Sequence, residues 1–139
     1  MIRDAAFKQL LHACKGYSQF TNGNSVEAGY KPDYVLKRSN EYIILESENS
    51  SSRKTFVGGL IKAAHFLSGE RKGILVFIIV PKTNTTDRAI ANHLRKYLSW
   101  VADKTNLRDV YVIEANAYYQ ANLVLPLLGK KFLSVAKKV

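Results

Sequence analysis

Hydrophobic and polar positions in the first fifty residues follow two different periods. From Asp4 to Tyr17 apolar residues recur at i, i+3, i+4 and i+7, the spacing of one helix face, which predicts a helix with Gly16 as its stop. The residues of this stripe are Phe7, Leu10, Leu11 and Cys14. Asp33–Lys37 and Glu41–Glu48 are short runs rich in Tyr, Val, Ile and Leu, and they predict two adjacent antiparallel strands.

The middle of the chain predicts a loop, a second helix and a buried strand. Residues 18–32 contain Asn-Gly and a further glycine, so we expect a hairpin or loop leading into an irregular strand. The serine run at 49–52 can cap a helix that ends near Gly69. Its stripe is Phe56, Val57, Leu60, Ile61, Ala64 and Leu67. The unbroken apolar run Gly73–Val80 is typical of a central strand covered on both faces.

The last part of the chain predicts one more helix and strand. Asn84–Asp87 resembles a capping box and precedes an amphipathic pattern that reaches Val101. Asp109–Glu114 alternates like a strand, and we expect a helix and a basic tail over residues 116–139. Helices that alternate with strands predict a single three-layer α/β domain over 1–139, built around a mixed sheet. Such a sheet usually places its chemistry at the ends of its strands.

Composition agrees with one self-sufficient domain. Hydrophobic residues make up 47% of the 139 positions, and a chain of this size buries enough surface to fold without disulfides or a structural metal. Cys14 is the single cysteine, which excludes an internal disulfide and a cysteine-rich zinc site and favours a cytoplasmic location. The apolar run 74–80 is too short to span a bilayer, so we expect no membrane anchor.

The balance of charge points to an anionic partner. Lys and Arg number 21 against 11 Asp and Glu, a formal net charge of +10. Basic side chains that neutralise phosphates release condensed counterions, so such a surplus favours nucleic acid as the partner. Nearly half of the acids nevertheless lie within residues 27–48. They are Glu27, Asp33, Glu41, Glu46 and Glu48.

Three of these acids are expected to converge. Side chains alternate across a strand, so Glu46 and Glu48 point to one side while Ser47 points away. The turn between the two strands brings Asp33 close to this pair. Two unit charges about 4 Å apart repel by about 4 kcal/mol at an effective dielectric near 20, so the cluster either holds protons or binds a cation. Oxygen ligands beside a phosphate substrate suit Mg²⁺ best.

The segment KPDYVLKRSNEYIILESE resembles the signature of the PD-(D/E)xK nucleases. Pro32-Asp33 supplies the Pro-Asp dipeptide, and Glu46-Ser47-Glu48 supplies the acidic residue, the variable residue and the last position, where Glu48 replaces the usual lysine. The resemblance covers roughly Asp4–Val80 and implies a restriction-endonuclease-like αβββαβ core. Some restriction enzymes of this superfamily carry glutamate at the last position and remain metal-dependent nucleases, whereas other relatives are inactive.

The resemblance also implies roles for individual residues. Asp33 and Glu46 would be ligands of Mg²⁺, or of Mn²⁺ as a substitute, together with the Ser47 carbonyl. Glu48 would ligate the metal or orient the attacking water. A lysine elsewhere can replace the missing one. Lys54, in the first turn of the second predicted helix, is the first candidate for contacting the phosphate, and Lys62 is the second because helical geometry turns it almost opposite the apolar stripe.

These expectations amount to a magnesium-dependent DNA endonuclease, restriction-like or junction-resolving. Cleavage of both strands would require two copies, so we expect a homodimer. The residues expected to contact nucleic acid are Lys31, Lys37, Arg53, Lys54 and Lys62. One alternative is a catalytically inactive nuclease fold that only binds nucleic acid. Another is a basic interaction domain, in which the three acids form a solvated strand edge paired with Lys37, Arg38 or Arg53.

Overall fold

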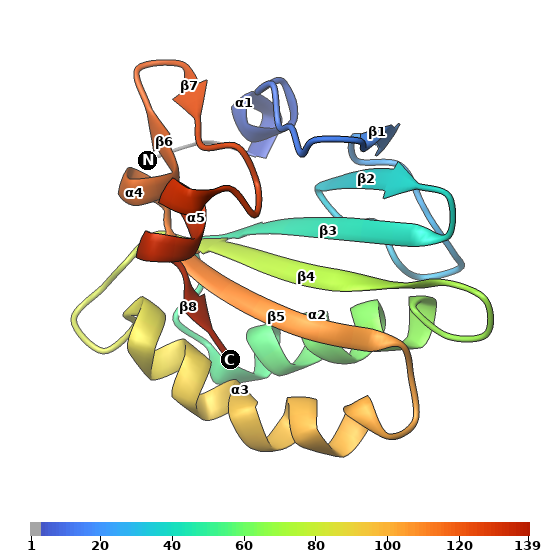
Figure 1. Cartoon of the computed structure of the whole chain (residues 1–139). Helices are drawn as coiled ribbons and strands as arrows, with labels where there is room; N and C mark the ends of the chain where they lie inside the picture. The colour runs from blue at the N-terminus through green and yellow to red at the C-terminus, as the bar shows by residue number, and fades with distance from the viewer. Residues whose placement is uncertain (1–3) are drawn as a thin grey trace.

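The computed structural model describes residues 4–139 and is built on a six-stranded mixed sheet. Figure 1 shows the sheet between two layers, with the long helices α2 (Arg53–Phe66) and α3 (Asp87–Ala102) side by side on one face. The strand order is β1 (Ser18–Thr21), β2 (Tyr34–Arg38), β3 (Glu41–Glu48), β4 (Lys72–Ile79), β5 (Leu107–Glu114) and β8 (Lys137–Lys138).

The sheet is parallel in its middle and antiparallel at both edges. β1, β2 and β3 are antiparallel neighbours, whereas β3, β4 and β5 run parallel. Parallel neighbours need long crossovers, which α2 and α3 provide. Gly73 is required where β4 begins, because a Cβ there would lie 2.0 Å from the Tyr42 carbonyl oxygen. The helix, three-strand, helix, strand order of the first eighty residues confirms the expected αβββαβ core in an α/β fold.

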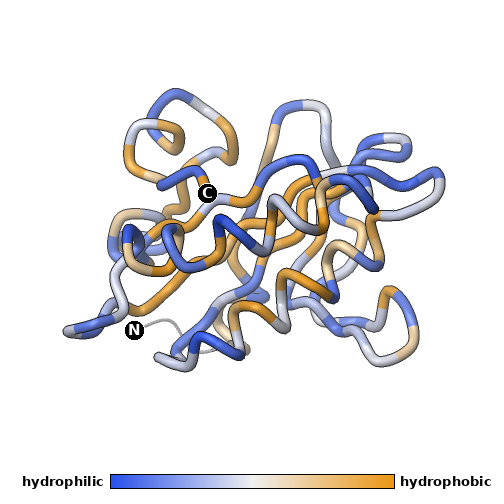
Figure 2. The backbone as a smooth tube through the Cα atoms, turned by 90° about the horizontal axis from the view of Figure 1, so that it is seen from below, coloured by the Kyte–Doolittle hydropathy of each residue, from blue (hydrophilic) through white to orange (hydrophobic). Residues whose placement is uncertain are grey.

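Each face of the sheet is sealed by its own hydrophobic cluster. On β3, Tyr42 and Ile44 pack with the cluster under α2 and α3, whereas Ile43 and Leu45 pack with the cluster on the opposite face. The continuous apolar runs of β3 and β4 therefore belong to strands that are covered on both sides. Figure 2, seen from the helical side, shows hydrophilic and hydrophobic segments alternating along the helices.

The N-terminal helix is much shorter than predicted. α1 covers only Asp4–Lys8, and the chain then turns so that Leu11 is 86% exposed. His12 takes the buried place instead: its Nε2 donates to the Phe7 carbonyl at 2.7 Å, and its Nδ1 accepts from the Tyr118 hydroxyl at 2.6 Å. Burial lowers the His12 pKa to about 4, so the ring is neutral. The spacing of apolar residues gives no sign of the His12–Tyr118 hydrogen bond, which lies just beyond the end of the helix.

Two further boundaries differ from the sequence prediction. The N-cap of α3 is Thr86, whose hydroxyl accepts from Ala89 N at 3.1 Å, so the expected capping box at Asn84–Asp87 lies two residues too early. The predicted C-terminal helix and free tail are replaced by small elements on the face opposite α2 and α3 (Figure 1). These are α4 (Ala115–Tyr118), β6 (Tyr119–Gln120), β7 (Leu123–Val124) and α5 (Lys130–Val135), followed by β8, which pairs with β5.

The left-handed backbone of Ala121 and Asn122 closes the hairpin between β6 and β7. Such residues interrupt the helix that the pattern predicted over this segment. None of the helices within residues 4–139 combines the length and the hydrophobicity needed to cross a membrane.

Candidate active site at the end of strand β3

Asp33 and Glu46 meet where the pairing of β2 and β3 ends. Tyr34 lies opposite Leu45, so Asp33 and Glu46 occupy the next register position. Asp33 N donates to Glu46 Oε1 at 3.1 Å, and Ser47 N donates to Asp33 Oδ2 at 2.8 Å. Both side chains lie on the α2 face of the sheet, because strand residues two apart share a face. The two carboxylates thus extend the ladder beyond its last backbone pair.

Glu46 and Glu48 line one small cavity at this strand end, as their shared face predicts. The cavity measures about 260 Å³ and lies between the end of β3 and the N-terminal half of α2. Glu48 also accepts a hydrogen bond from Ser50 N at 2.9 Å, in the turn that leads to α2. The residues that line it are Tyr30, Lys31, Glu46, Glu48, Thr55, Gly58, Gly59, Lys62 and Phe77.

The cavity raises the pKa of Glu46 to about 8. Burial is the largest cause, followed by the negative charge of Asp33, and Glu48 adds to it. The hydrogen bond from Asp33 N and the charge of Lys62 act in the opposite direction. Because the side chains that raise this pKa are anionic, the cavity favours either a proton or a bound cation.

Tyr30 brings an unsatisfied hydroxyl to the same cavity. The ring is 3% exposed, and its hydroxyl oxygen has no hydrogen-bond partner among the described residues. Burial is the largest cause that raises the Tyr30 pKa, so the hydroxyl stays protonated and is available as a donor. A buried polar group without a partner is costly, and a ligand or water bound in the cavity would supply the acceptor it lacks.

A loop folded against α2 places Tyr30. His65 Nδ1 lies 2.7 Å from Glu27 Oε2, and Lys62 Nζ donates to the Gly29 carbonyl at 3.1 Å. Sequence reasoning singled out Glu27 and Lys31 in this loop but not Tyr30. The available signal was its position three residues before Asp33, at the start of a tightly turned segment.

The predicted basic residues separate into three places. Lys31 and Lys62 line the carboxylate cavity, whereas Arg53 and Lys54 line a groove beside it. Lys37 lies toward the other end of β2, with its Nζ 5.1 Å from the centre of the Phe20 ring. The structure therefore brings Lys62, and not the first candidate Lys54, to the carboxylates.

Fewer carboxylates are positioned to bind a metal ion than the three expected from the sequence. Within residues 4–139, no group of three or more His, Cys, Asp or Glu side chains is arranged to hold a metal ion. The structure joins Asp33 and Glu46 directly, while the carboxylate of Glu48 is engaged by Ser50 N. Two carboxylates still suit Mg²⁺, which retains several waters and binds through one or two carboxylates beside a phosphate.

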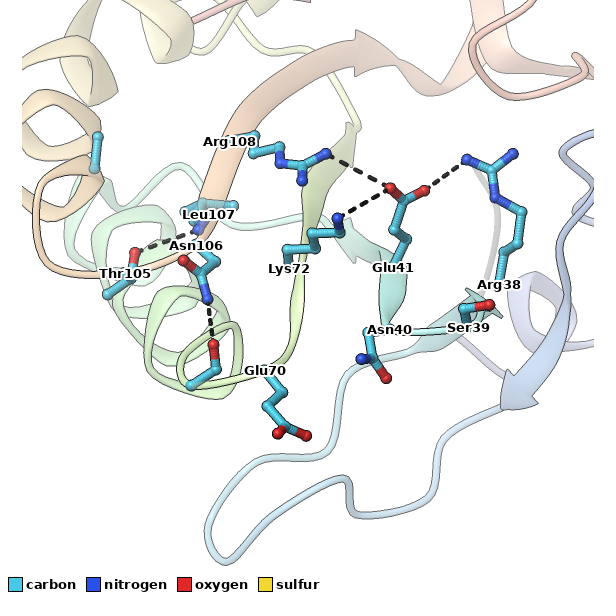
Figure 3. Close-up of a pocket in the computed structure, with 12 residues that line it drawn as sticks. Arg38, Ser39, Asn40, Glu41, Glu70, Lys72, Thr105, Asn106, Leu107 and Arg108 are labelled. Atoms are coloured by element: carbon cyan, nitrogen blue, oxygen red, sulfur yellow. Dashed lines mark hydrogen bonds and ion pairs between the residues drawn. The ribbon is translucent and has the colours of Figure 1, made fainter.

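Glu41, at the opposite end of β3, has a very different environment (Figure 3). Arg38 Nη2 lies 2.6 Å from Glu41 Oε2, and both Lys72 Nζ and Arg108 Nη1 lie 3.7 Å from Oε1. The hydrogen bond from Arg38, followed by one from Tyr17, lowers the pKa of Glu41. This carboxylate receives its countercharge from the protein itself.

Comparison with known proteins finds one distant structural similarity. No protein-family model matches the chain, and no curated protein matches it. Among solved structures, SfsA of Pyrococcus furiosus in complex with Ca²⁺ is 17% identical, with a TM-score of 0.38. The match covers 72% of this chain and 49% of that one, so the chain spans about half the length of SfsA. The function proposed below rests on the geometry of the site.

Proposed function

We propose that the protein is a metal-dependent endonuclease that hydrolyses phosphodiester bonds in DNA at the Asp33–Glu46 site. The observation that carries the proposal is the Glu46 carboxyl group, held in a cavity beside two other acids and with its pKa raised to about 8. When ionised, the Glu46 carboxylate would be stabilised by a bound cation, and the net charge of +10 favours a phosphate substrate.

Asp33 and Glu46 would hold the metal, with the Ser47 carbonyl as a further oxygen donor. Mg²⁺, or Mn²⁺ in its place, supplies a water of lowered pKa and neutralises charge on the scissile phosphate when bound. Ser47 N and Asp33 N each hold one oxygen of a carboxylate. Such outer hydrogen bonds fix the orientation of metal-binding groups.

Other side chains of the cavity have roles that follow from their chemistry. The ammonium group of Lys62 would bind a phosphate oxygen in place of the lysine that Glu48 replaces. The Tyr30 hydroxyl, which has no partner among the described residues, would donate to a second phosphate oxygen. Glu48 would accept a hydrogen bond from the attacking water and orient it.

Nicking of supercoiled plasmid in the presence of Mg²⁺ or Mn²⁺ tests the proposal. The wild-type protein should convert the supercoiled plasmid to open circles or to linear DNA. Asp33→Asn should abolish cleavage while binding DNA as well as wild type or better, because one negative charge is removed. Mg²⁺ should also raise the melting temperature of the wild-type protein and not that of Asp33→Asn. Absence of both nicking and a thermal shift would contradict the proposal.

The products also report the number of copies that act together. One chain carries one such site and cuts one strand, so cleavage of both strands requires two copies related by symmetry. A working homodimer therefore yields linear plasmid, whereas an independent monomer accumulates open circles first.

A second candidate is a nucleic-acid-binding protein that does not cut. The hydrogen bonds from Asp33 N to Glu46 and from Ser47 N to Asp33 favour it, since they also close a strand end. This candidate predicts binding that weakens steeply with salt and no response to divalent ions beyond that screening.

A further inference from the structure

A basic groove runs between α2 and α3 on the outer side of the molecule. It consists of two adjoining hollows of about 490 and 750 Å³ that share Arg53 and His93 in their walls. Four cationic side chains line it, two from the first turn of α2 and two from the middle of α3. They are Arg53, Lys54, Arg95 and Lys96.

The positive charge of this groove has no countercharge within the described chain. None of the described residues that line it is acidic, and none of its four cations forms an ion pair with a described residue. Arg53 instead donates to neutral oxygens, the Asn84 carbonyl at 2.5 Å and the Thr85 hydroxyl at 3.4 Å. The cations at the far end of β3 differ, because Glu41 pairs with them.

Gly58 joins the groove to the carboxylate cavity. It lines both, and a Cβ at this position would meet no heavy atom within 4 Å. Glycine inside a helix costs about 0.5–1 kcal/mol relative to alanine. The adjacent Gly59 is explained by packing, since its Cβ would lie 3.1 Å from the Phe77 ring. No such neighbour explains Gly58, which lies where the groove and the cavity meet.

We propose that this groove binds the phosphodiester backbone of DNA and leads one strand to the carboxylate cavity. The inference deepens the proposed nuclease function and rests on it for the destination of the strand, whereas the binding itself rests on the unpaired cations. Along α3 the groove extends from Ala89 to Ser99, about 15 Å at the helical rise, which matches roughly four nucleotides of one strand. Four cations and four phosphates are thus comparable in number.

Fluorescence anisotropy with a labelled DNA duplex in EDTA tests the groove without cleavage. The double variant Arg95→Gln/Lys96→Gln should bind about tenfold more weakly than wild type, and its slope of log affinity against log salt should be smaller by about two. The control, Lys130→Gln/Lys131→Gln, removes the same charge from exposed positions of α5 on the other face of the sheet. It should change affinity less than threefold.

The outcomes separate the groove from the nuclease. Equal loss of affinity in the two double variants would overturn the groove, because only total charge would then matter. Binding of an RNA duplex of the same sequence but not of DNA would overturn the assignment to DNA. Groove-dependent DNA binding by a wild-type protein that never nicks plasmid would support the groove and overturn the nuclease proposal.

Discussion

Glu41 and Glu46 lie on the same strand, on opposite ends of its pairing with β2, and their carboxylates have opposite environments. Glu41 is surrounded by Arg38, Lys72 and Arg108, and its pKa is lowered. Glu46 lies in a cavity with other acids, and its pKa is raised to about 8. The protein thus neutralises one glutamate internally and leaves the other to a proton or an external cation.

The environments of the two glutamates separate a structural acid, Glu41, from a candidate functional acid, Glu46. A carboxylate that serves only the fold is stabilised by cations of the same chain, as at Glu41. Lys31 and Lys62 line the cavity of Glu46, but neither forms an ion pair with it in the described part of the chain, and four other cations line the α2–α3 groove. Under the proposed function, the acids would bind a metal ion and the groove cations would bind phosphates.

The largest contrast is expected when each glutamate is neutralised in turn. Glu46→Gln should reduce Mg²⁺-dependent nicking by about 10³-fold, because a metal ligand is lost. Glu41→Gln, the matched change on the same strand, should change it less than threefold. Initial nicking rates at equal protein concentration give both numbers, and equal losses would abolish the functional distinction between the two acids.

The next contrast separates the two candidate lysines. Lys62→Met should lower the nicking rate by about 10²-fold, since its ammonium group lies at the carboxylate cavity. Lys54→Met should lower it only a few-fold, through weaker DNA binding in the groove. Rates at saturating DNA distinguish the two effects, because the Lys54 defect should then disappear. A larger catalytic defect in Lys54→Met than in Lys62→Met would show that Lys54 is the residue that contacts the phosphate, as the sequence suggested.

The two glutamates should also make stability respond to pH in opposite directions. The folded protein holds the Glu46 proton up to about pH 8, whereas the unfolded chain releases it near pH 4.5, so this contribution to stability is present at low pH and is lost as pH rises between these values. We expect about 2 kcal/mol, less than the full linkage value because the side chain is partly exposed. Denaturant titrations over a range of pH measure the free energy of unfolding. In Glu46→Gln this free energy should not show the decrease between pH 4.5 and about pH 8.

Glu41 supplies the control for the pH response. Its lowered pKa means that its contribution is present above the ordinary glutamate value and is lost as pH falls through the folded value. Glu41→Gln should therefore alter only the acid limb of the stability profile. A change in the neutral limb of that variant would contradict the assignment of the neutral limb to Glu46.

The smallest effects are expected at the two adjacent glycines of α2. Gly58→Ala should stabilise the fold by about 0.5–1 kcal/mol, because its Cβ enters open space. Gly59→Ala should gain nothing or lose stability, since its Cβ must displace the buried Phe77 ring. Denaturation midpoints measure both. A destabilising Gly58→Ala would contradict the open space around this position.

Alternation of side chains along β3 was sufficient to predict that Glu46 and Glu48 share one face. The turn between the two predicted strands placed Asp33 near this pair. The position of Lys62 could not be predicted, since its helix position indicates solvent and only the loop carrying Gly29 and Tyr30 reveals its role. Nor could local spacing reveal that Ser50 N engages Glu48.

The N-terminal helix was overestimated for a related reason. The stripe treated Leu11 as buried, but long-range pairing of His12 with Tyr118 decides which side chain enters the core. Partners more than a hundred residues apart leave no trace in a periodicity that extends over only a few turns.

The hydrogen bonds that orient Asp33 and Glu46 come from main-chain amides, which no substitution at neighbouring positions can delete, proline excepted. The arrangement should therefore tolerate drift in the identity of the surrounding side chains. It should not tolerate drift in length: one residue inserted between Asp33 and Val35 would rotate Asp33 to the opposite face of the sheet. Insertions and deletions, rather than replacements, are the genetic changes to which this strand end is most vulnerable.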